Sequence, residues 1–180
     1  MATAQRAADS IKKINRQNVF RPANITRKIS KDAIALLKTD HAAVKICFKD
    51  YQKLVKTDAP AHEKKSLAKK ICDMLKIHAQ IEEEIFYPAA RALLADDASL
   101  VDEADVEHAS AKDLIAQIEN SSLDDMHYDA KVKVLGEYID HHVQEEQDEI
   151  FPAVKKAGMD IKAVGQQLAV RKAELIDSAE

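Results

Sequence analysis

The sequence has 180 residues, and its formal net charge of −4 does not by itself indicate a nucleic-acid or membrane partner. Only three glycines and four prolines accompany abundant alanine, leucine, lysine and glutamate, which favours an all-α protein. No apolar run approaches the roughly 18 residues that a membrane span needs, and the N-terminus has no apolar core like that of a secretory signal.

The first element in chain order is a basic N-terminal arm, residues 1–30. Residues 1–31 hold eight lysines and arginines but only one acid, Asp9, a net charge of +7 in a chain that is negative overall. Such an arm has the composition of an organelle transit peptide or of a nucleic-acid-binding tail. We favour the alternative that it packs against the acidic body of its own chain or of a neighbour.

After the arm, apolar residues recur at steps of three and four, the pattern of amphipathic helices with one buried face. We predict four long helices and a shorter fifth one, over residues 30–56, 61–95, 100–120, 126–157 and 161–176. Ser30 is the expected N-cap of the first helix, and Gly158 ends the fourth. Long helices joined by short polar turns predict an antiparallel up-down four-helix bundle over residues 31–158, with residues 159–180 forming a short C-terminal helix.

Each of the four long helices carries a histidine near the middle of its predicted buried face. The four are His41, His78, His108 and His142. One histidine on an apolar face is usually a core residue that has a hydrogen-bond partner. In a four-helix bundle, however, four such imidazoles converge on the central axis, where a dry core makes them costly without a partner. A bound cation is the partner that explains all four.

The second and fourth helices also share a longer pattern, His-x3-Glu-x5-Pro, with tyrosine or phenylalanine directly before the proline. The two copies are His78, Glu82, Tyr87 and Pro88, and His142, Glu146, Phe151 and Pro152. The chain thus contains two helical hairpins of the same design, each ending in a proline that we expect to kink its helix. Residues four apart lie about one turn apart on one helix face, so each imidazole and carboxylate can bind one metal, or the carboxylate can bridge two.

Four histidines and two carboxylates exceed the four ligands of a structural zinc site. Imidazoles mixed with bridging carboxylates suit a pair of iron or manganese ions, with positions left for water, hydroxide or oxygen. The composition of the predicted ligand set therefore favours a two-metal centre over a purely structural zinc site.

These residues resemble the hemerythrin-like (HHE cation-binding) family over roughly residues 30–158. The segments that carry the resemblance are DHAAV around His41, HAQIEEEIFYP from His78, EHASA around His108 and HHVQEEQDEIFP from His141. The resemblance implies a non-haem di-iron centre, bridged by an oxo or hydroxo group. It implies that His41 and His78 bind one iron, that His108 and His142 bind the other, and that Glu82 and Glu146 bridge them. Manganese and zinc are the alternative metals for the same residues.

Two positions depart from the pattern of the oxygen-carrying hemerythrins. Those proteins have a second histidine one turn after the histidine of the third helix, where this chain has Lys112. They use an aspartate where this chain has Gln147, and Glu146 takes that role here. Fewer imidazole ligands suit redox chemistry or sensing at least as well as reversible oxygen carriage. The arm has no cysteine, which argues against the iron-sulfur repair branch of the family.

Three further residues lie near the fourth-helix histidine, namely His141, Glu145 and Tyr138. His141 and Glu145 also have the His-x3-Glu spacing, but they lie about 100° off the buried stripe, so we prefer His142 as the ligand. Tyr138, one turn before His142, is a candidate to donate a hydrogen bond to a bound oxygen species or to bind iron. The alternative is that Tyr138 is an ordinary core residue.

The expected function is that of a metal-binding di-iron protein that binds or reacts with O2, peroxide or another diatomic-sized ligand, with enzymatic activity left open. The alternatives are a non-catalytic iron store, buffer or sensor, and a structural bundle without metal. The two cysteines do not make a disulfide scaffold, so we expect a reducing compartment, the cytoplasm. We expect neither nucleic acid nor a membrane as a partner.

Overall fold

The computed structural model describes residues 32–94, 99–122 and 124–179, and the basic arm at residues 1–30 lies outside them. The described part is helical and contains no β-strand, which confirms the all-α prediction. In chain order the helices are α2 (Ala33–Lys56), α3 (Ala61–Ile81), η2 (Glu82–Phe86), α4 (Tyr87–Leu93), α5 (Ser99–Asn120), α6 (Tyr128–Glu145), η4 (Glu146–Ile150), α7 (Phe151–Lys156) and α8 (Ile161–Ala179).

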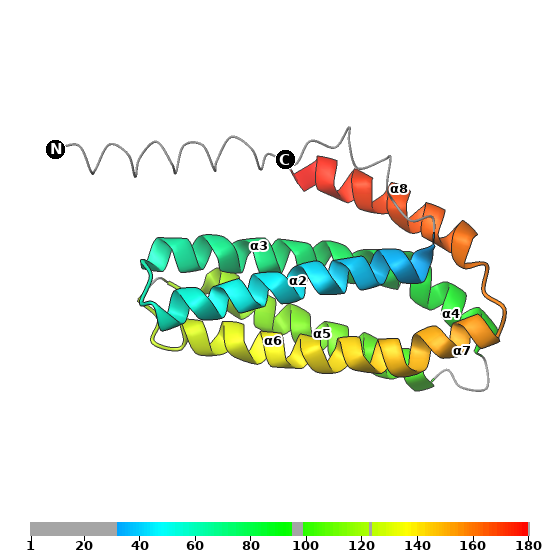
Figure 1. Ribbon diagram of the computed structural model, residues 1–180, viewed down its shortest axis with the longest axis horizontal. Coiled ribbons are helices and arrows are strands. Elements are labelled where there is room, and N and C mark those ends of the chain that lie inside the picture. Colours follow the sequence, from blue (N-terminus) through cyan, green and yellow to red (C-terminus); the bar gives the residue numbers. More distant parts are fainter. Residues whose placement is uncertain (1–31, 95–98, 123, 180) are drawn as a thin grey trace.

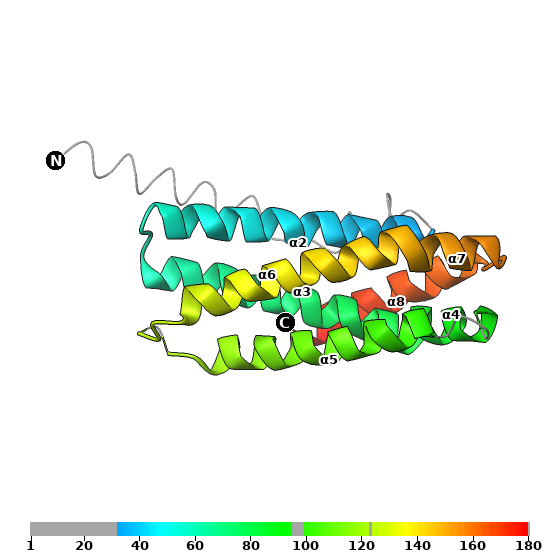
Figure 2. The same ribbon diagram turned by 90° about the horizontal axis from the view of Figure 1, so that it is seen from below.

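The four long helical rods lie side by side as two antiparallel hairpins (Figures 1 and 2). Helices α2 and α3 form one hairpin and α5 and α6 the other, while η2 with α4 and η4 with α7 continue α3 and α6. Helix α8 lies across the outside of the first hairpin and packs against α2, α3 and η2 (Figure 1). None of the described helices has the length and apolarity that a membrane span requires.

The start of α2 differs from the prediction. The helix begins at Ala33, and its N-cap is Asp32 rather than Ser30. The Asp32 carboxylate accepts hydrogen bonds from the backbone N–H groups of Ile34 and Ala35, at 2.9 and 3.3 Å. A short acidic side chain here satisfies two helix-end donors and complements the helix dipole, which is why aspartate serves as well as serine.

The predicted second and fourth helices are not continuous α-helices. Each widens into a single π-helical turn that begins at the glutamate of the repeated motif, Glu82 in η2 and Glu146 in η4. In each turn the backbone N–H of the aromatic residue, Tyr87 or Phe151, donates to the carbonyl of that glutamate, five residues earlier. The proline comes next, in the first turn of the following helix.

The prolines account for these wide turns. Proline has no N–H to donate, and in a regular α-helix its ring clashes with the carbonyl of the residue four positions earlier. An extra residue in the preceding turn relieves that clash and rotates the helix that follows. The chain therefore accommodates Pro88 and Pro152 through π turns, features that often occur at functional sites.

The hydrophobic core is divided into two clusters by a polar layer. One cluster lies at the end of the bundle near α4, α7 and α8, and includes Leu37, Ile81 and Phe86. The other lies toward the opposite end, and includes Val44 and Leu75. The predicted histidines fall between the two clusters on every helix, so apolar packing encloses the polar layer on both sides.

Candidate metal centre

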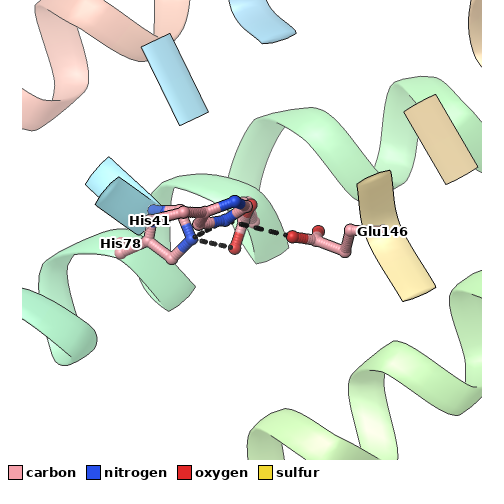
Figure 3. A group of neighbouring side chains, drawn as sticks. His41, His78 and Glu146 are labelled. Atoms are coloured by element: carbon pink, nitrogen blue, oxygen red, sulfur yellow. Dashed lines mark hydrogen bonds and ion pairs between the residues drawn. The ribbon is translucent and has the colours of Figure 1, made fainter. Parts of the chain in front are cut away.

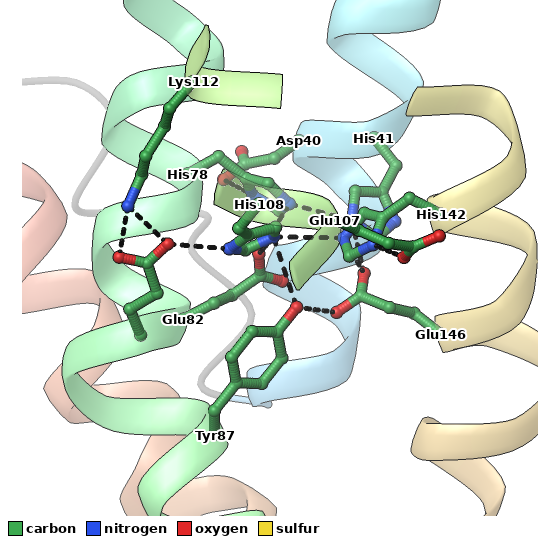
Figure 4. A network of polar contacts seen from close by, with 11 residues as sticks. Asp40, His41, His78, Glu82, Tyr87, Glu107, His108, Lys112, His142 and Glu146 are labelled. Carbon is green, nitrogen blue, oxygen red and sulfur yellow. Dashed lines mark hydrogen bonds and ion pairs between the residues drawn. The ribbon is translucent and has the colours of Figure 1, made fainter. Parts of the chain in front are cut away.

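All six predicted ligand side chains meet in the polar layer (Figure 4). The histidines come one from each of α2, α3, α5 and α6, and the glutamates from the first positions of η2 and η4. The four histidines are at most 8% exposed, and the two glutamates are fully buried. Each π turn begins at the glutamate that follows a histidine by one helical turn. The histidine and the glutamate of each motif therefore face the same layer of the bundle.

The first half of the centre contains His41 and His78 (Figure 3). Their Nε2 atoms are 2.9 Å apart, and each faces a carboxylate at 3.2 Å. His41 faces Glu146 from the opposite hairpin, and His78 faces Glu82 from its own chain segment. One ligand atom from each of these four residues lies within 4.8 Å of all the others, a grouping that can hold one cation.

The second half contains His108 and His142. Their Nε2 atoms are 3.1 Å apart. Oε2 of Glu82 lies 3.6 Å from Nε2 of His108, and Oε2 of Glu146 lies 3.7 Å from Nε2 of His142. The same two carboxylates therefore face both histidine pairs, which is the arrangement that two neighbouring cations with bridging carboxylates require.

The buried histidines and glutamates suit a bound metal ion better than they satisfy one another's hydrogen-bonding groups. Both carboxylate oxygens of Glu82 and Oε2 of Glu146 are buried without a hydrogen-bond partner. Burial, followed by the neighbouring Glu146 carboxylate, raises the pKa of Glu82 well above its usual value. Burial, followed by the charge of His142, lowers the pKa of His108 to about 4, so this imidazole is a neutral ligand at pH 7. A buried carboxylate needs a positive charge nearby to remain ionised, and a cation supplies it.

Carboxylates outside the centre approach the far side of three imidazoles. The Nδ1 atoms of His78, His108 and His142 lie 3.5, 3.0 and 2.6 Å from Asp40, Glu83 and Glu107, respectively. Such contacts hold an imidazole with its other nitrogen toward the metal and strengthen it as a ligand. Among the described residues, the buried Nδ1 atoms of His41 and His78 have no hydrogen-bond partner, so the 3.5 Å approach of Asp40 to His78 is an electrostatic contact and not a hydrogen bond.

These outer acids follow the internal repeat, although the motif analysis assigned no role to Asp40 or Glu107. Each directly precedes the histidine of the first helix of its hairpin and contacts the histidine of the second helix. An acid before the histidine in both DHAAV and EHASA is the signal that identifies them. Glu83, which follows Glu82, corresponds to Gln147 in the second hairpin. That difference accounts for the missing acid at His41.

Tyr87 is a part of the site that the sequence analysis left without a role. Its side chain is fully buried, and its hydroxyl donates a hydrogen bond to Oε1 of Glu146 at 3.0 Å and lies 3.3 Å from Nε2 of His108. The corresponding Phe151 stacks on the ring of His41, with ring centres 6.1 Å apart. The His108 side of the polar layer therefore borders a hydroxyl, and the His41 side borders an aromatic face. The tyrosine directly before the first proline was the available signal.

Two residues near His142 lie outside this group. Tyr138 is half-buried at the edge of the core cluster that includes Val44, and no described hydrogen bond joins it to the six residues, so its role stays a prediction. The side chain of His141 is 64% exposed, and its Nε2 lies 3.2 Å from Glu145. The structure thus places His142 at the centre and His141 at the surface.

A small cavity of about 20 Å³ lies beside the four histidines. Its walls are mainly aliphatic and include Val44, Ala111, Ile115 and Ile139. A cavity needs roughly 10–15 Å³ to hold one water molecule, so only very small molecules fit here without rearrangement.

Comparison with known proteins agrees with this geometry. The model of the hemerythrin HHE cation binding domain matches residues 32–154. The crystal structure of a hemerythrin HHE cation binding domain-containing protein from Mycobacterium kansasii is similar to this chain, with a TM-score of 0.68 and 23% sequence identity. The similarity covers 82% of this chain and 89% of that one, and it shows a shared fold. No curated protein matches the chain.

Proposed function

Because the chain belongs to the hemerythrin HHE cation-binding domain family, we propose that its six buried histidine and glutamate side chains hold a non-haem di-iron centre that binds or reacts with O2 or peroxide. The metals would be joined by the two carboxylates and by an oxo or hydroxo group. Manganese or zinc would suit the same donors less specifically.

The observation that carries this proposal is the position of Glu82 and Glu146. Both carboxylates are fully buried, both face two histidines from different helices, and three of their four oxygens have no hydrogen-bond partner. A structural bundle without metal would be destabilised by such a layer, since buried unpaired polar groups cost free energy. A two-metal centre would provide the unpaired oxygens with the positive partner that they lack.

The protein's own residues would hold and shield the centre. Iron would supply the redox and Lewis-acid chemistry. Glu107 and Glu83 would orient the imidazoles of His142 and His108 through their Nδ1 atoms. The Tyr87 hydroxyl keeps a proton next to Oε1 of Glu146, because burial followed by the charges of Glu82 and Glu146 raises the pKa of Tyr87 well above its usual value.

The size and the aliphatic wall of the cavity support the proposal that the ligand is small and neutral. The cavity lies against all four histidines and is enclosed by side chains such as Val44 and Ile139. Its volume suits water, a diatomic molecule or peroxide and excludes larger organic substrates. The two cysteines, Cys47 and Cys72, are buried and free, which supports a reducing compartment, and we place the protein in the cytoplasm.

Metal analysis combined with absorption spectroscopy tests the proposal. Protein produced with ample iron should hold about two irons per chain at equilibrium, as di-iron bundles do, and show absorption bands that change on addition of O2 or peroxide. His142→Ala should lose iron, while His141→Ala should retain it once loading is complete. Two irons without an optical response would favour a store, buffer or sensor. One zinc, or no metal, would contradict the di-iron centre.

A further inference from the structure

A second group of potential metal ligands lies outside the centre, on the facing sides of α5 and α6. His141 and Glu145 are one helical turn apart on α6, with Nε2 and Oε1 at 3.2 Å. Glu107 reaches toward them from α5, with Oε1 at 4.0 Å from Nε2 of His141. One ligand atom from each of the three lies within 4.8 Å of the others, close enough to hold one cation.

The three side chains form a gradient from solvent to the interior. The side chain of His141 is 64% exposed, that of Glu145 31% and that of Glu107 only 10%. The Glu107 carboxylate extends this series to the centre itself, because its other oxygen accepts a hydrogen bond from Nδ1 of His142 at 2.6 Å (Figure 4). Glu107 thus belongs to the outer group and also contacts a proposed iron ligand.

A cavity of about 30 Å³ borders both the outer group and the centre. Its wall includes Glu107 and Glu145 of the outer group, but not His141, together with the buried His142 and Glu146 of the centre. Glu146, in the cavity wall, is fully buried, and among the described residues its Oε2 has no hydrogen-bond partner. The cavity is large enough for a water-sized species and reaches the centre from a face other than the aliphatic one.

The charge of this cavity selects for cations. Besides the residues already named, Glu103 and Glu149 contribute to its wall, and among the described residues no lysine or arginine does. Walls of one charge sign in a partly enclosed cleft concentrate ions of the opposite sign. The aliphatic cavity on the other side has no acid in its wall and includes Lys76 and Lys112 instead. The two cavities therefore differ in the species they admit.

The other two outer acids, Glu83 and Asp40, are paired with lysines. Lys112 contacts both carboxylate oxygens of Glu83, at 2.6 and 2.5 Å, and Lys172 on α8 pairs with Asp40. Among the described ion pairs, Glu107 has only histidine partners. Of the three acids behind imidazoles, it is the one whose charge remains available to an incoming cation.

We propose that Glu107, His141 and Glu145 form an outer site for a divalent cation, Fe²⁺ in the first instance, and that the acidic cavity passes the ion from this site to the buried centre. One imidazole nitrogen and two carboxylate oxygens, completed by water, suit Fe²⁺ or Mn²⁺. The exposure of His141 makes the site an exchangeable one. The passage to the centre rests on the proposed di-iron function, whereas the outer site itself does not.

Two measurements on the full chain test the two parts separately. The first counts Mn²⁺ bound by metal-loaded protein, by electron paramagnetic resonance, in wild type and Glu145→Gln. The second follows Fe²⁺ loading of metal-stripped protein under anaerobic conditions at limiting metal. Glu137→Gln, an exposed substitution of the same kind on α6 that lies outside the cavity wall, is the matched control.

The expected result is one exchangeable Mn²⁺ per wild-type chain that Glu145→Gln lacks and Glu137→Gln retains. Loading of Glu145→Gln should be about tenfold slower, the scale of electrostatic attraction into a charged cleft, with the same final iron content. An unchanged Mn²⁺ count would overturn the outer site, and unchanged loading would overturn the passage. A wild-type chain that never fills its centre would contradict the di-iron function, while the Mn²⁺ count would still decide the outer site.

Discussion

The hydroxyl of Tyr87 donates a 3.0 Å hydrogen bond to Oε1 of Glu146, so an aromatic residue at the end of one hairpin holds a carboxylate from the other. Both residues owe their positions to π turns. The turn that begins at Glu82 rotates Tyr87 into the core, and the turn that begins at Glu146 follows from the same motif in the second hairpin. The repeated sequence thus produces a contact between its two copies.

Replacing Tyr87 by phenylalanine tests this contact. The fold should persist, because Phe151 occupies the equivalent position in the other hairpin. Loss of a hydrogen bond to a charged group should lower the free energy of unfolding by about 1.5–3 kcal/mol. Denaturant unfolding measures this, and absorption spectroscopy should show altered bands of the iron-loaded protein. Tyr51→Phe is the control, because Tyr51 donates to Asp129 at 2.7 Å outside the metal-ligand group, so its loss should affect stability alone.

Removing the metal should destabilise the whole bundle. Without a cation, Glu82 and Glu146 remain buried beside four imidazoles with unpaired oxygens. A metal present at about 1,000 times its dissociation constant stabilises the folded state by about 4 kcal/mol, which for a chain of this size raises Tm by roughly 10 °C. Calorimetry of loaded and stripped protein measures the difference. Equal melting temperatures would count against a metal centre in this layer.

Asp40→Asn should weaken metal binding without unfolding the protein. Asp40 lies 3.5 Å from Nδ1 of His78 and is held by Lys172 from α8. Loss of an acid that orients a ligating imidazole typically costs roughly 10–100-fold in metal affinity. Competition with a chelator measures that affinity. Asp140→Asn provides the comparison, since Asp140 pairs with Lys45 at the surface, and an equal effect of the two substitutions would contradict the orienting role.

Gly136 is explained by the packing of α6 against α2. A Cβ atom at this position would lie 3.0 Å from Cδ1 of Phe48, closer than ordinary van der Waals contact. Overpacking typically costs about 1–3 kcal/mol, more than the roughly 1 kcal/mol that alanine gains over glycine in a helix, so Gly136→Ala should be destabilising. In a Phe48→Ala background the three ring atoms nearest to this Cβ are absent, so the clash is removed and the same substitution should become neutral or stabilising. Thermal or denaturant unfolding of the four proteins completes the cycle.

The aliphatic cavity can be filled without touching a proposed ligand. Ala111→Val adds two methyl groups to a wall that is shared with the histidines, so it should retain iron but react with O2 or peroxide roughly tenfold more slowly, the effect of about 1.4 kcal/mol on a barrier. Stopped-flow absorption measures the rate. Ala68→Val is the control, because it makes the same change at a buried position on α3 that does not line the cavity. A normal rate in Ala111→Val would mean that small molecules reach the centre by another path.

The sequence alone determined the helices and the candidate ligands. Helix periodicity is local, so the apolar stripes and their histidines could be read from residue spacing, and so could the repeated motif with Glu82 and Glu146. The start of the first helix was harder to predict, because Asp32 and Ser30 are both good N-caps and only the surrounding packing selects one. The family match over residues 32–154 and the helical fold confirm the broader interpretation.

Only the tertiary structure decided which groups surround the candidate ligands. Asp40 contacts His78 and Glu107 contacts His142 because neighbouring helices are aligned in one particular register, which no single helix encodes. The partner of Tyr87 and the acidic cavity between α5 and α6 depend on that register too. Spacing along one helix fixes the face on which a side chain lies. The residues that this face contacts are determined by interhelical packing, which the two π turns alter in this bundle. These contacts can therefore be identified only in the assembled structure.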